Sequence, residues 1–210
     1  DGTASRVYTP TQTSSLGNGR TAVAISSGYE HTCAVLDDGS VSCWGNGNAG
    51  QLGDGTTTQR TTPTQTSSLG NGRTAVAISS GNEHTCTVLD DGAVSCWGYN
   101  NKGQVGDGTT TQRNTPTQTS SLGAGRTVAF SERDLDGDGI LNIFDSTPYP
   151  STTNPSNPLP QRNVAGFQEG SIFTNQTLAS GGSHTCAILD NGSVSCWGNG
   201  DKGRLGNGGT

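Results

Sequence analysis

The sequence predicts an all-β protein made of three tandem repeats, each with about four short antiparallel strands. A pattern that starts at Gly28 as GYEHTCAVLDDGSVSCWGNG returns at Gly81 as GNEHTCTVLDDGAVSCWGYN and at Gly181 as GGSHTCAILDNGSVSCWGNG. Short apolar runs alternate with glycine-rich turns, and helical periodicity is absent from the pattern. Because self-similarity at a fixed period indicates a repeat architecture, the repeats guide the interpretation more than the total length does.

The middle of each copy predicts a β-hairpin. Val35 and Val41 lie on runs of small, β-branched and aromatic residues, and the LDDGS sequence between these runs supplies a turn whose glycine takes a positive φ. A three-residue loop of this kind places Cys33 opposite Cys43, within the distance that a disulfide spans. The same spacing recurs in each copy. The predicted disulfides are Cys33–Cys43, Cys86–Cys96 and Cys186–Cys196.

Two alternatives for the cysteines stay open at this point. They could be reduced thiols, or His31 could bind a metal together with Cys33 and Cys43. We favour disulfides, because a metal site of this kind would offer only three protein ligands and would occur in triplicate. Regularly spaced cysteine pairs are typical of an oxidising compartment, so we expect an extracellular or cell-surface location.

The remaining strands come from the segments between the hairpins. The sequence GRTAVAISSG alternates apolar and polar residues, as a half-buried strand does. Before it stands TPTQTSSLG, which contains Pro10, Pro63 and Pro116. Together with the hairpin these segments give about four strands per repeat, the size of a propeller blade.

An insertion interrupts the third copy, and the two ends of the chain share one phase of the repeat. Asp1 begins the sequence DGT, which stands at the same place in the repeat as the DGT that begins at Asp54. The last four residues, NGGT, stand at that place again. We therefore expect a whole number of repeats. The predicted parts are repeat 1 at 1–53, repeat 2 at 54–106, repeat 3 at 107–130 and 177–210, and the inserted calcium-loop and Pro/Asn-rich segment at 131–176.

The insertion carries the strongest ligand motif of the sequence, DLDGDGILNIFDSTP. Alternate carboxylates at positions 1, 3 and 5 of a calcium loop converge on one hard cation, and the glycine at position 6 allows the sharp turn. We expect bound calcium to make the insertion rigid, because it neutralises carboxylates that otherwise repel one another. The predicted ligands are Asp134, Asp136, Asp138, the carbonyl of Ile140, Asn142 and Asp145.

Composition excludes several partners. The net charge of -6 argues against nucleic acid or an anionic membrane surface, and no apolar run is long enough to span a bilayer. Only 28% of the residues are hydrophobic, so no single repeat can bury a large core. Stability must therefore come from cross-links and from neighbouring repeats.

The conjunction of GxxHTC, the DG turn, CWG and GQLGDG resembles the repeat of the regulator of chromosome condensation family, in its cysteine-bearing extracellular bacterial or archaeal form. The resemblance covers the chain apart from the insertion. It implies blades of a seven-bladed β-propeller, and three blades imply an incomplete or open one. Nucleotide exchange is not implied, because that activity resides in particular loops of the family. The calcium motif resembles the thrombospondin type 3 repeat.

Residues that recur in every copy are expected to be architectural. For His31, His84 and His184 we favour a buried ring that hydrogen-bonds a neighbouring strand over catalysis. The tryptophans are expected to cover the disulfides. Copies 1 and 2 differ mainly in the loop after the tryptophan, at 46–49 and 99–102. We expect this loop to face outward, where it either contacts partners or drifts neutrally. The tryptophans are Trp44, Trp97 and Trp197.

Two sequons, at Asn175 and Asn191, match the acceptor pattern for N-glycosylation. The runs rich in threonine and serine, such as TTTQRTTPTQTSS, are also candidates for O-linked sugar on composition.

We expect a non-enzymatic structural protein, a building unit of a cell-surface array or fibre stabilised by disulfides and calcium. Its partners would be copies of itself or adjacent repeats of a longer chain. The alternative is a propeller module that binds proteins or glycans through the loops after each tryptophan. A secreted enzyme would need chemistry in the insertion, where the carboxylates are assigned to calcium. Nuclear exchange activity fits the cysteines and the acidic charge least well.

Overall fold

The computed structural model describes residues 2, 7–17, 19–123, 126–128, 178–189, 193–201 and 205. The chain divides into two units, Asp1–Phe130 with Thr177–Thr210, and Ser131–Gln176. The predicted calcium ligands from Asp134 to Asp145 lie outside the described residues, as do both sequon asparagines.

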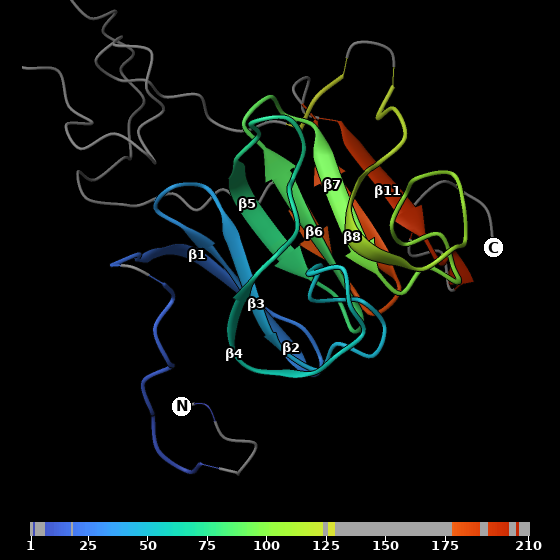
Figure 1. Cartoon of the computed structure of the whole chain (residues 1–210). Helices are drawn as coiled ribbons and strands as arrows, with labels where there is room; N and C mark the ends of the chain where they lie inside the picture. Colours follow the sequence, from blue (N-terminus) through green and yellow to red (C-terminus); the bar gives the residue numbers. More distant parts are fainter. Residues whose placement is uncertain are drawn as a thin grey trace, which may run out of the picture. The chain divides into compact units, whose positions relative to one another are not determined.

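Three antiparallel sheets hold the strands of the described residues, and we call them blades 1, 2 and 3 in chain order (Figure 1). For the described residues, the prediction of an all-β fold is confirmed. Blades 1 and 2 have four strands each, whereas the described part of blade 3 has three. The described residues include no helix long and apolar enough to cross a membrane. The strands are β1 (Ala22–Ser27), β2 (His31–Leu36), β3 (Val41–Gly45) and β4 (Arg60–Gln65); β5 (Ala75–Ser80), β6 (His84–Leu89), β7 (Val94–Gly98) and β8 (Arg113–Gln118); and β9 (Leu178–Ser180), β10 (His184–Ile188) and β11 (Val194–Gly198).

The central hairpin of each blade has the predicted register. In blade 1 the N–H of Gly39, which has a φ of 72°, donates to the carbonyl of Leu36 at 2.8 Å and closes the turn. Cys33 therefore faces Cys43 across β2 and β3, and the two form a disulfide. The hairpins of blades 2 and 3 repeat this arrangement, with the disulfides Cys86–Cys96 and Cys186–Cys196.

Proline marks the outer edge of blades 1 and 2. β4 contains Pro63 and lies at the end of the strand order β1-β2-β3-β4. Its pairing with β3 shifts register between Cys43 and Gly45, so Pro63 stands at the irregular part of the ladder. Proline lacks the N–H that a regular ladder needs and is tolerated at edges and bulges. The TPTQ segment thus forms the last strand of a blade.

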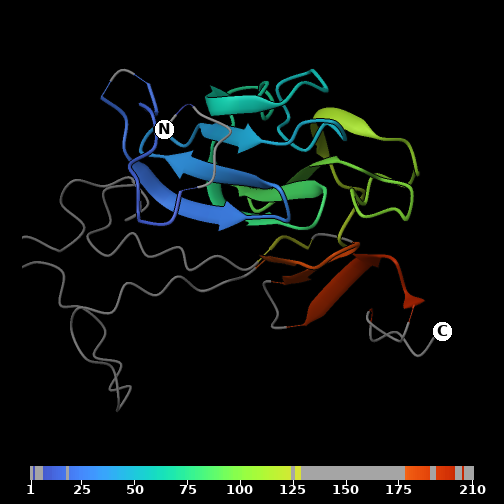
Figure 2. The same ribbon diagram turned by 90° about the horizontal axis from the view of Figure 1, so that it is seen from below.

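The hydrophobic core lies between consecutive blades. Strands β1 and β2 of blade 1 contact β5 of blade 2, and β5 and β6 contact β9 of blade 3, so blade 2 stands between the other two (Figure 2). A blade with so few apolar residues cannot enclose a core alone, and the next blade covers its disulfide. The first core consists of Cys33, Val35, Val41, Cys43 and Leu52 of blade 1 with Ala75, Ile78 and Trp97 of blade 2.

A glycine of the GQLGDG segment makes room for the tryptophan of the next blade. Gly53 has a φ of +70°, and a Cβ atom at this position would lie 2.7 Å from Nε1 of Trp97. The Trp97 side chain is fully buried, and its Nε1 donates to the carbonyl of Gln51 at 2.9 Å. The glycine therefore lets the backbone of blade 1 approach the indole of blade 2 closely.

We predict that Gly53→Ala destabilises the fold more than Gly72→Ala. Gly72 has a similar φ of +72°, and a Cβ atom at this position would have nothing within 4 Å, so both variants share the backbone strain of a left-handed alanine, about 1 kcal/mol. Gly53→Ala must also displace Trp97, which adds about 1 to 3 kcal/mol. Denaturant unfolding measures the two losses of free energy. Equal losses would show that the Gly53–Trp97 contact is unimportant.

Candidate functional site

The polar groups at the junction of blades 1 and 2 form a closed hydrogen-bond network. Oγ1 of Thr85, on β6, donates to the carbonyl of Gln51 at 3.0 Å, and it lies 2.8 Å from Nε2 of His31, on β2. A hydroxyl has a single hydrogen to donate. Because Thr85 gives its hydrogen to Gln51, Nε2 of His31 must donate to Thr85, which fixes the proton of the neutral ring on Nε2.

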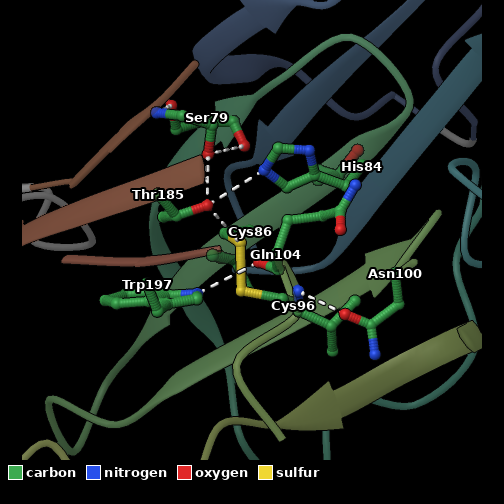
Figure 3. The surroundings of a disulfide bond; sticks show 12 residues. Ser79, His84, Cys86, Cys96, Asn100, Gln104, Thr185 and Trp197 are labelled. Atoms are coloured by element: carbon green, nitrogen blue, oxygen red, sulfur yellow. Dashed lines mark hydrogen bonds between the residues drawn. A yellow bond between two sulfur atoms is a disulfide. The ribbon is translucent and has the colours of Figure 1, made fainter. Parts of the chain in front are cut away.

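The junction of blades 2 and 3 repeats the contact. Nε2 of His84 lies 2.9 Å from Oγ1 of Thr185, and Nε1 of Trp197 donates to the carbonyl of Gln104 at 3.0 Å, beside the Cys86–Cys96 disulfide (Figure 3). The tryptophan of each later blade thus packs over the disulfide of the blade before it, and not over its own.

The buried histidines resist protonation. Burial lowers the pKa of His31 from 6.5 to about 4, and it lowers the pKa of His84 to about 4 with help from the charges of the other two histidines. Nδ1 of either ring has no hydrogen-bond partner among the described residues. The ring of His31 lies against the backbone of Gly28, where a Cβ atom would come within 2.3 Å of it. A proton added at Nδ1 would therefore have no acceptor.

The loop after the tryptophan, expected to face outward, is partly interior. Asn100 is fully buried, and its Nδ2 donates to the carbonyls of Thr109 at 3.1 Å and Thr111 at 2.9 Å. Its Oδ1 accepts from the N–H of Val105 at 2.9 Å. Buried amides that are fully paired in this way fix the loop conformation. Gly47 and Ala49 of blade 1 are buried as well, and the exposed tips of these loops are Asn48, Asn101 and Lys102.

An aspartate–arginine pair anchors the second half of this loop in blades 1 and 2. Oδ1 of Asp107 accepts from the N–H of Thr109 at 3.0 Å, and its Oδ2 lies 2.6 Å from Nη2 of Arg113. Burial alone would raise the pKa of Asp107, but the hydrogen bonds from Thr109 and Arg113 and the arginine charge outweigh it and lower the pKa. Asp54 makes the same contacts with Thr56 and Arg60. The loops are thus rigid supports for their tips.

A polar hollow of about 560 Å³ lies beside the hairpin turn of blade 1. Arg20 lines it, with Nη2 2.7 Å from Oδ2 of Asp38 and Nη1 3.4 Å from Oδ1 of Asp37. In the part of the chain that the structure describes, no three His, Cys, Asp or Glu side chains gather as a metal site, and the cysteines are paired. The alternative of a His31, Cys33 and Cys43 metal site therefore finds no support there.

Sequence reasoning missed Thr85, Gln51 and Asn100. The first two carry a signal, because threonine directly follows the histidine in every copy and GQ precedes an aliphatic residue, Leu52 or Val105, in copies 1 and 2. The pairing of Thr85 with a different repeat is set by tertiary packing. Copy 2 has Asn100 where copy 1 has Gly47. In the sequence this difference resembles a neutral substitution at the surface, and only the structure shows that Asn100 is buried.

We predict that acid weakens the fold between pH 6.5 and 4. In this window the unfolded chain protonates histidine at its ordinary pKa of 6.5, while folded His31 and His84 stay neutral down to about 4. Proton uptake thus favours the unfolded state, and each histidine removes about 3 kcal/mol of stability by pH 4. Above pH 6.5 both states are neutral and the contribution vanishes.

Denaturant unfolding across this pH range measures the slope. The double variant His31→Gln with His84→Gln is expected to flatten the slope between pH 6.5 and 4, because glutamine retains an Nε2 donor but does not titrate. The aspartates whose pKa is lowered affect the stability of the fold below this pH range. An unchanged slope in the double variant would assign the acid sensitivity to other groups.

Known proteins contain the same repeat. Two family models described as the regulator of chromosome condensation (RCC1) repeat match the chain, one at residues 38–88 and 91–131 and the other at 22–51, 75–104 and 176–204. The ultraviolet-B receptor UVR8 of Arabidopsis thaliana is 29% identical over 204 residues, which cover 89% of this chain and 43% of the receptor. The probable E3 ubiquitin-protein ligase HERC4 of Homo sapiens is 30% identical over 199 residues, covering 90% of this chain and 18% of the ligase.

Solved structures agree on the fold. Yeast RCC1 (Prp20), in its crystal structure with Kap60, matches with a TM-score of 0.58 at 17% identity, over 89% of this chain and 34% of that one. Human WBSCR16 matches with a TM-score of 0.51 at 21% identity, over 90% and 50%. The chain spans less than half the length of the curated relatives it matches. By its repeat sequence and its blades, the chain belongs to the regulator of chromosome condensation (RCC1) repeat family.

Proposed function

We propose that this chain is a non-enzymatic, extracellular interaction module that binds a protein partner through the loops after its tryptophans. The observation that carries the proposal is the internal anchoring of the loop around Asn100, whose buried amide makes three hydrogen bonds to the loop backbone. A loop held in one conformation loses little entropy on binding. Its exposed tip carries Lys102 where blade 1 has the buried Ala49, so the two tips present different side chains at this position.

The burial of His31 and His84 supports a non-enzymatic role. Nε2 of His31 and Nε2 of His84 are engaged by threonines of the next blade, away from solvent. A catalytic base must reach its substrate. These rings instead join one blade to the next.

Relatives favour a binding role. UVR8 is an ultraviolet-B receptor, and yeast RCC1 (Prp20) is bound to Kap60 in one crystal structure and has binding properties to Gsp1p and histones. A location outside the cell is supported by the three disulfides within the hairpins, because such bonds persist in oxidising compartments.

A second candidate is the building unit of a cell-surface array or fibre. It is favoured by the large apolar side chains exposed on blades 1 and 3, Val23 and Ile25 on one and Ile188 and Val194 on the other. Monomeric proteins rarely leave such groups together at the surface without a partner.

Photocrosslinking tests the binding role. A benzoylphenylalanine at Asn48 or Asn101 is expected to crosslink a protein partner on the cells that produce the chain, because these tips are exposed on rigid loops. Matched controls carry the same group at Thr62 and Thr115, which are exposed on the edge strands β4 and β8. Crosslinks of equal yield from the edge strands would overturn the assignment to the loops.

We also propose that the insertion binds one calcium ion through the side chains of Asp134, Asp136, Asp138, Asn142 and Asp145 and the carbonyl of Ile140.

Calorimetric titration is expected to show one calcium ion per chain, and the double variant Asp136→Asn with Asp138→Asn is expected to abolish the binding, since it removes two carboxylates from a hard-cation site. The control is Asp37→Asn with Asp90→Asn, which makes the same change of charge at two hairpin turns. Equal loss of calcium in both double variants would point to diffuse charge attraction and not to a site.

A further inference from the structure

The dipeptide Asn-Gly recurs in this chain, and an asparagine followed by glycine is prone to a spontaneous chemical change. The backbone nitrogen of the glycine attacks the side-chain amide carbon of the asparagine, a cyclic succinimide forms, and ammonia leaves. Water then opens the ring to aspartate or isoaspartate. Glycine favours ring closure because it has no Cβ atom beside the attacking nitrogen. The Asn-Gly pairs begin at Asn18, Asn46, Asn71, Asn191, Asn199 and Asn207.

Three of these pairs lie among the described residues, in different surroundings. The pairs at Asn46 and Asn199 follow the tryptophans of blades 1 and 3, whereas the pair at Asn71 lies in the turn that leads to β5. Asn46 and Asn71 both stand between two glycines, so their local sequences are closely alike. A large difference between their rates must therefore come from the fold. The remaining pairs lie outside the described residues.

The side-chain amide of Asn46 is held at both ends. Its Nδ2 donates to Oε2 of Glu30 at 2.7 Å, and its Oδ1 accepts from the N–H of Asn48 at 2.8 Å. The glycine nitrogen must approach the face of the amide plane, and turning this plane breaks both hydrogen bonds. The loss of a hydrogen bond to a charged group is by itself enough to slow a reaction about tenfold.

The backbone of Gly47, which carries the attacking nitrogen, is confined as well. The residue is buried, and a Cβ atom at this position would clash with the carbonyl of Thr58. Its own carbonyl accepts from the N–H of Gly50 at 2.8 Å. Asn199 shares part of this protection, because its Oδ1 accepts from the N–H of Asp201 at 2.9 Å.

The Asn71–Gly72 pair has none of these restraints. Both residues are exposed, and a Cβ atom at Gly72 would meet nothing within 4 Å. No hydrogen bond joins the side chain of Asn71 to another described residue. The turn is closed by the N–H of Arg73, which donates to the carbonyl of Gly70 at 3.1 Å. A glycine on each side of Asn71 lets the backbone take the conformation that ring closure requires.

We propose that Asn71 is a modification site, at which the folded chain converts asparagine to aspartate and isoaspartate. Asn46, which precedes the same residue type, is protected by its loop. The reaction consumes one water molecule and releases one ammonia molecule, and it needs no enzyme. The inference goes beyond the proposed function, because it concerns the turn before β5 and not the loop tips.

The product places a negative charge beside an arginine that already has acidic partners. Nη2 of Arg73 lies 2.9 Å from Oδ2 of Asp91, and its Nη1 lies 3.4 Å from Oδ2 of Asp90. A carboxylate at residue 71 competes for this guanidinium. Ion pairs at the surface contribute little to stability, so the fold tolerates the competition. The modified chain therefore stays folded and accumulates as a more acidic form.

Peptide mapping of the full chain, aged in mildly alkaline buffer, measures the conversion at each site. Trypsin cuts after Arg60 and Arg73, so Asn71 is the only asparagine of its peptide. The product differs from asparagine in mass, and fragmentation by electron transfer distinguishes isoaspartate from aspartate. In the folded chain we expect Asn71 to convert at least about tenfold faster than Asn46.

The unfolded chain is the matched control. After reduction of the disulfides and in denaturant, the rates at Asn46 and Asn71 are expected to converge, because only the local sequence then acts. In the folded chain, Glu30→Ala removes the acceptor of the Asn46 amide and is expected to raise the rate at Asn46. Glu83→Ala makes the same change at the equivalent turn of blade 2 and is expected to leave that rate unchanged.

Equal conversion of Asn46 and Asn71 in the folded chain would overturn the proposal. So would an Asn71 that stays intact in the folded chain while the unfolded chain converts. An Asn46 rate that Glu30→Ala leaves unchanged would overturn the assignment of the protection to the contact with Glu30. None of these outcomes depends on a binding partner, so they leave the crosslinking test of the loop tips untouched.

Discussion

Each blade depends on the next one to cover its disulfide, and this dependence organises the structure. Only 28% of the residues are hydrophobic, so a single four-stranded sheet has too few apolar side chains for a core of its own. The disulfide holds the hairpin together, and Ile78 and Trp97 of the following blade exclude water from it. Stability therefore resides in the junctions, and an uncovered blade face is an incomplete core.

Burying polar groups at these junctions constrains the order of the blades. Thr85 reaches both His31 and the carbonyl of Gln51, so a displaced junction would leave three polar groups without partners away from water. Unpaired buried groups cost more than paired ones contribute, which penalises wrong junctions more than it rewards the right one. The buried side chains of Ile78 and Trp97 supply the stabilisation, and the polar network supplies the specificity.

Buried contacts beneath the surface loops hold these loops rigid. Asn100 and the Asp107–Arg113 pair hold the loop backbone from beneath, so the exposed Asn101 and Lys102 stand on a fixed support. Substitution at the tips leaves the blade intact, and one scaffold can therefore present different contacts in different blades. The exposed loop tips and the junction faces consequently consist of separate residues, so substitutions at the tips leave the junctions unchanged.

The sequence by itself determined the elements that depend on local chemistry. The LDDGS turn sets the register that joins Cys33 to Cys43, and the alternation of AVAISS sets the first strand of blades 1 and 2. It also defined the calcium motif, which lies outside the described residues. Only the tertiary structure decided which blade each recurring residue contacts. Trp97 covers the disulfide of the preceding blade, Thr85 binds a histidine one repeat earlier, and Asn100 lies inside a loop expected to be solvated. Near-identical repeats do not indicate which copy contacts which, because these contacts depend on packing between segments far apart in the chain.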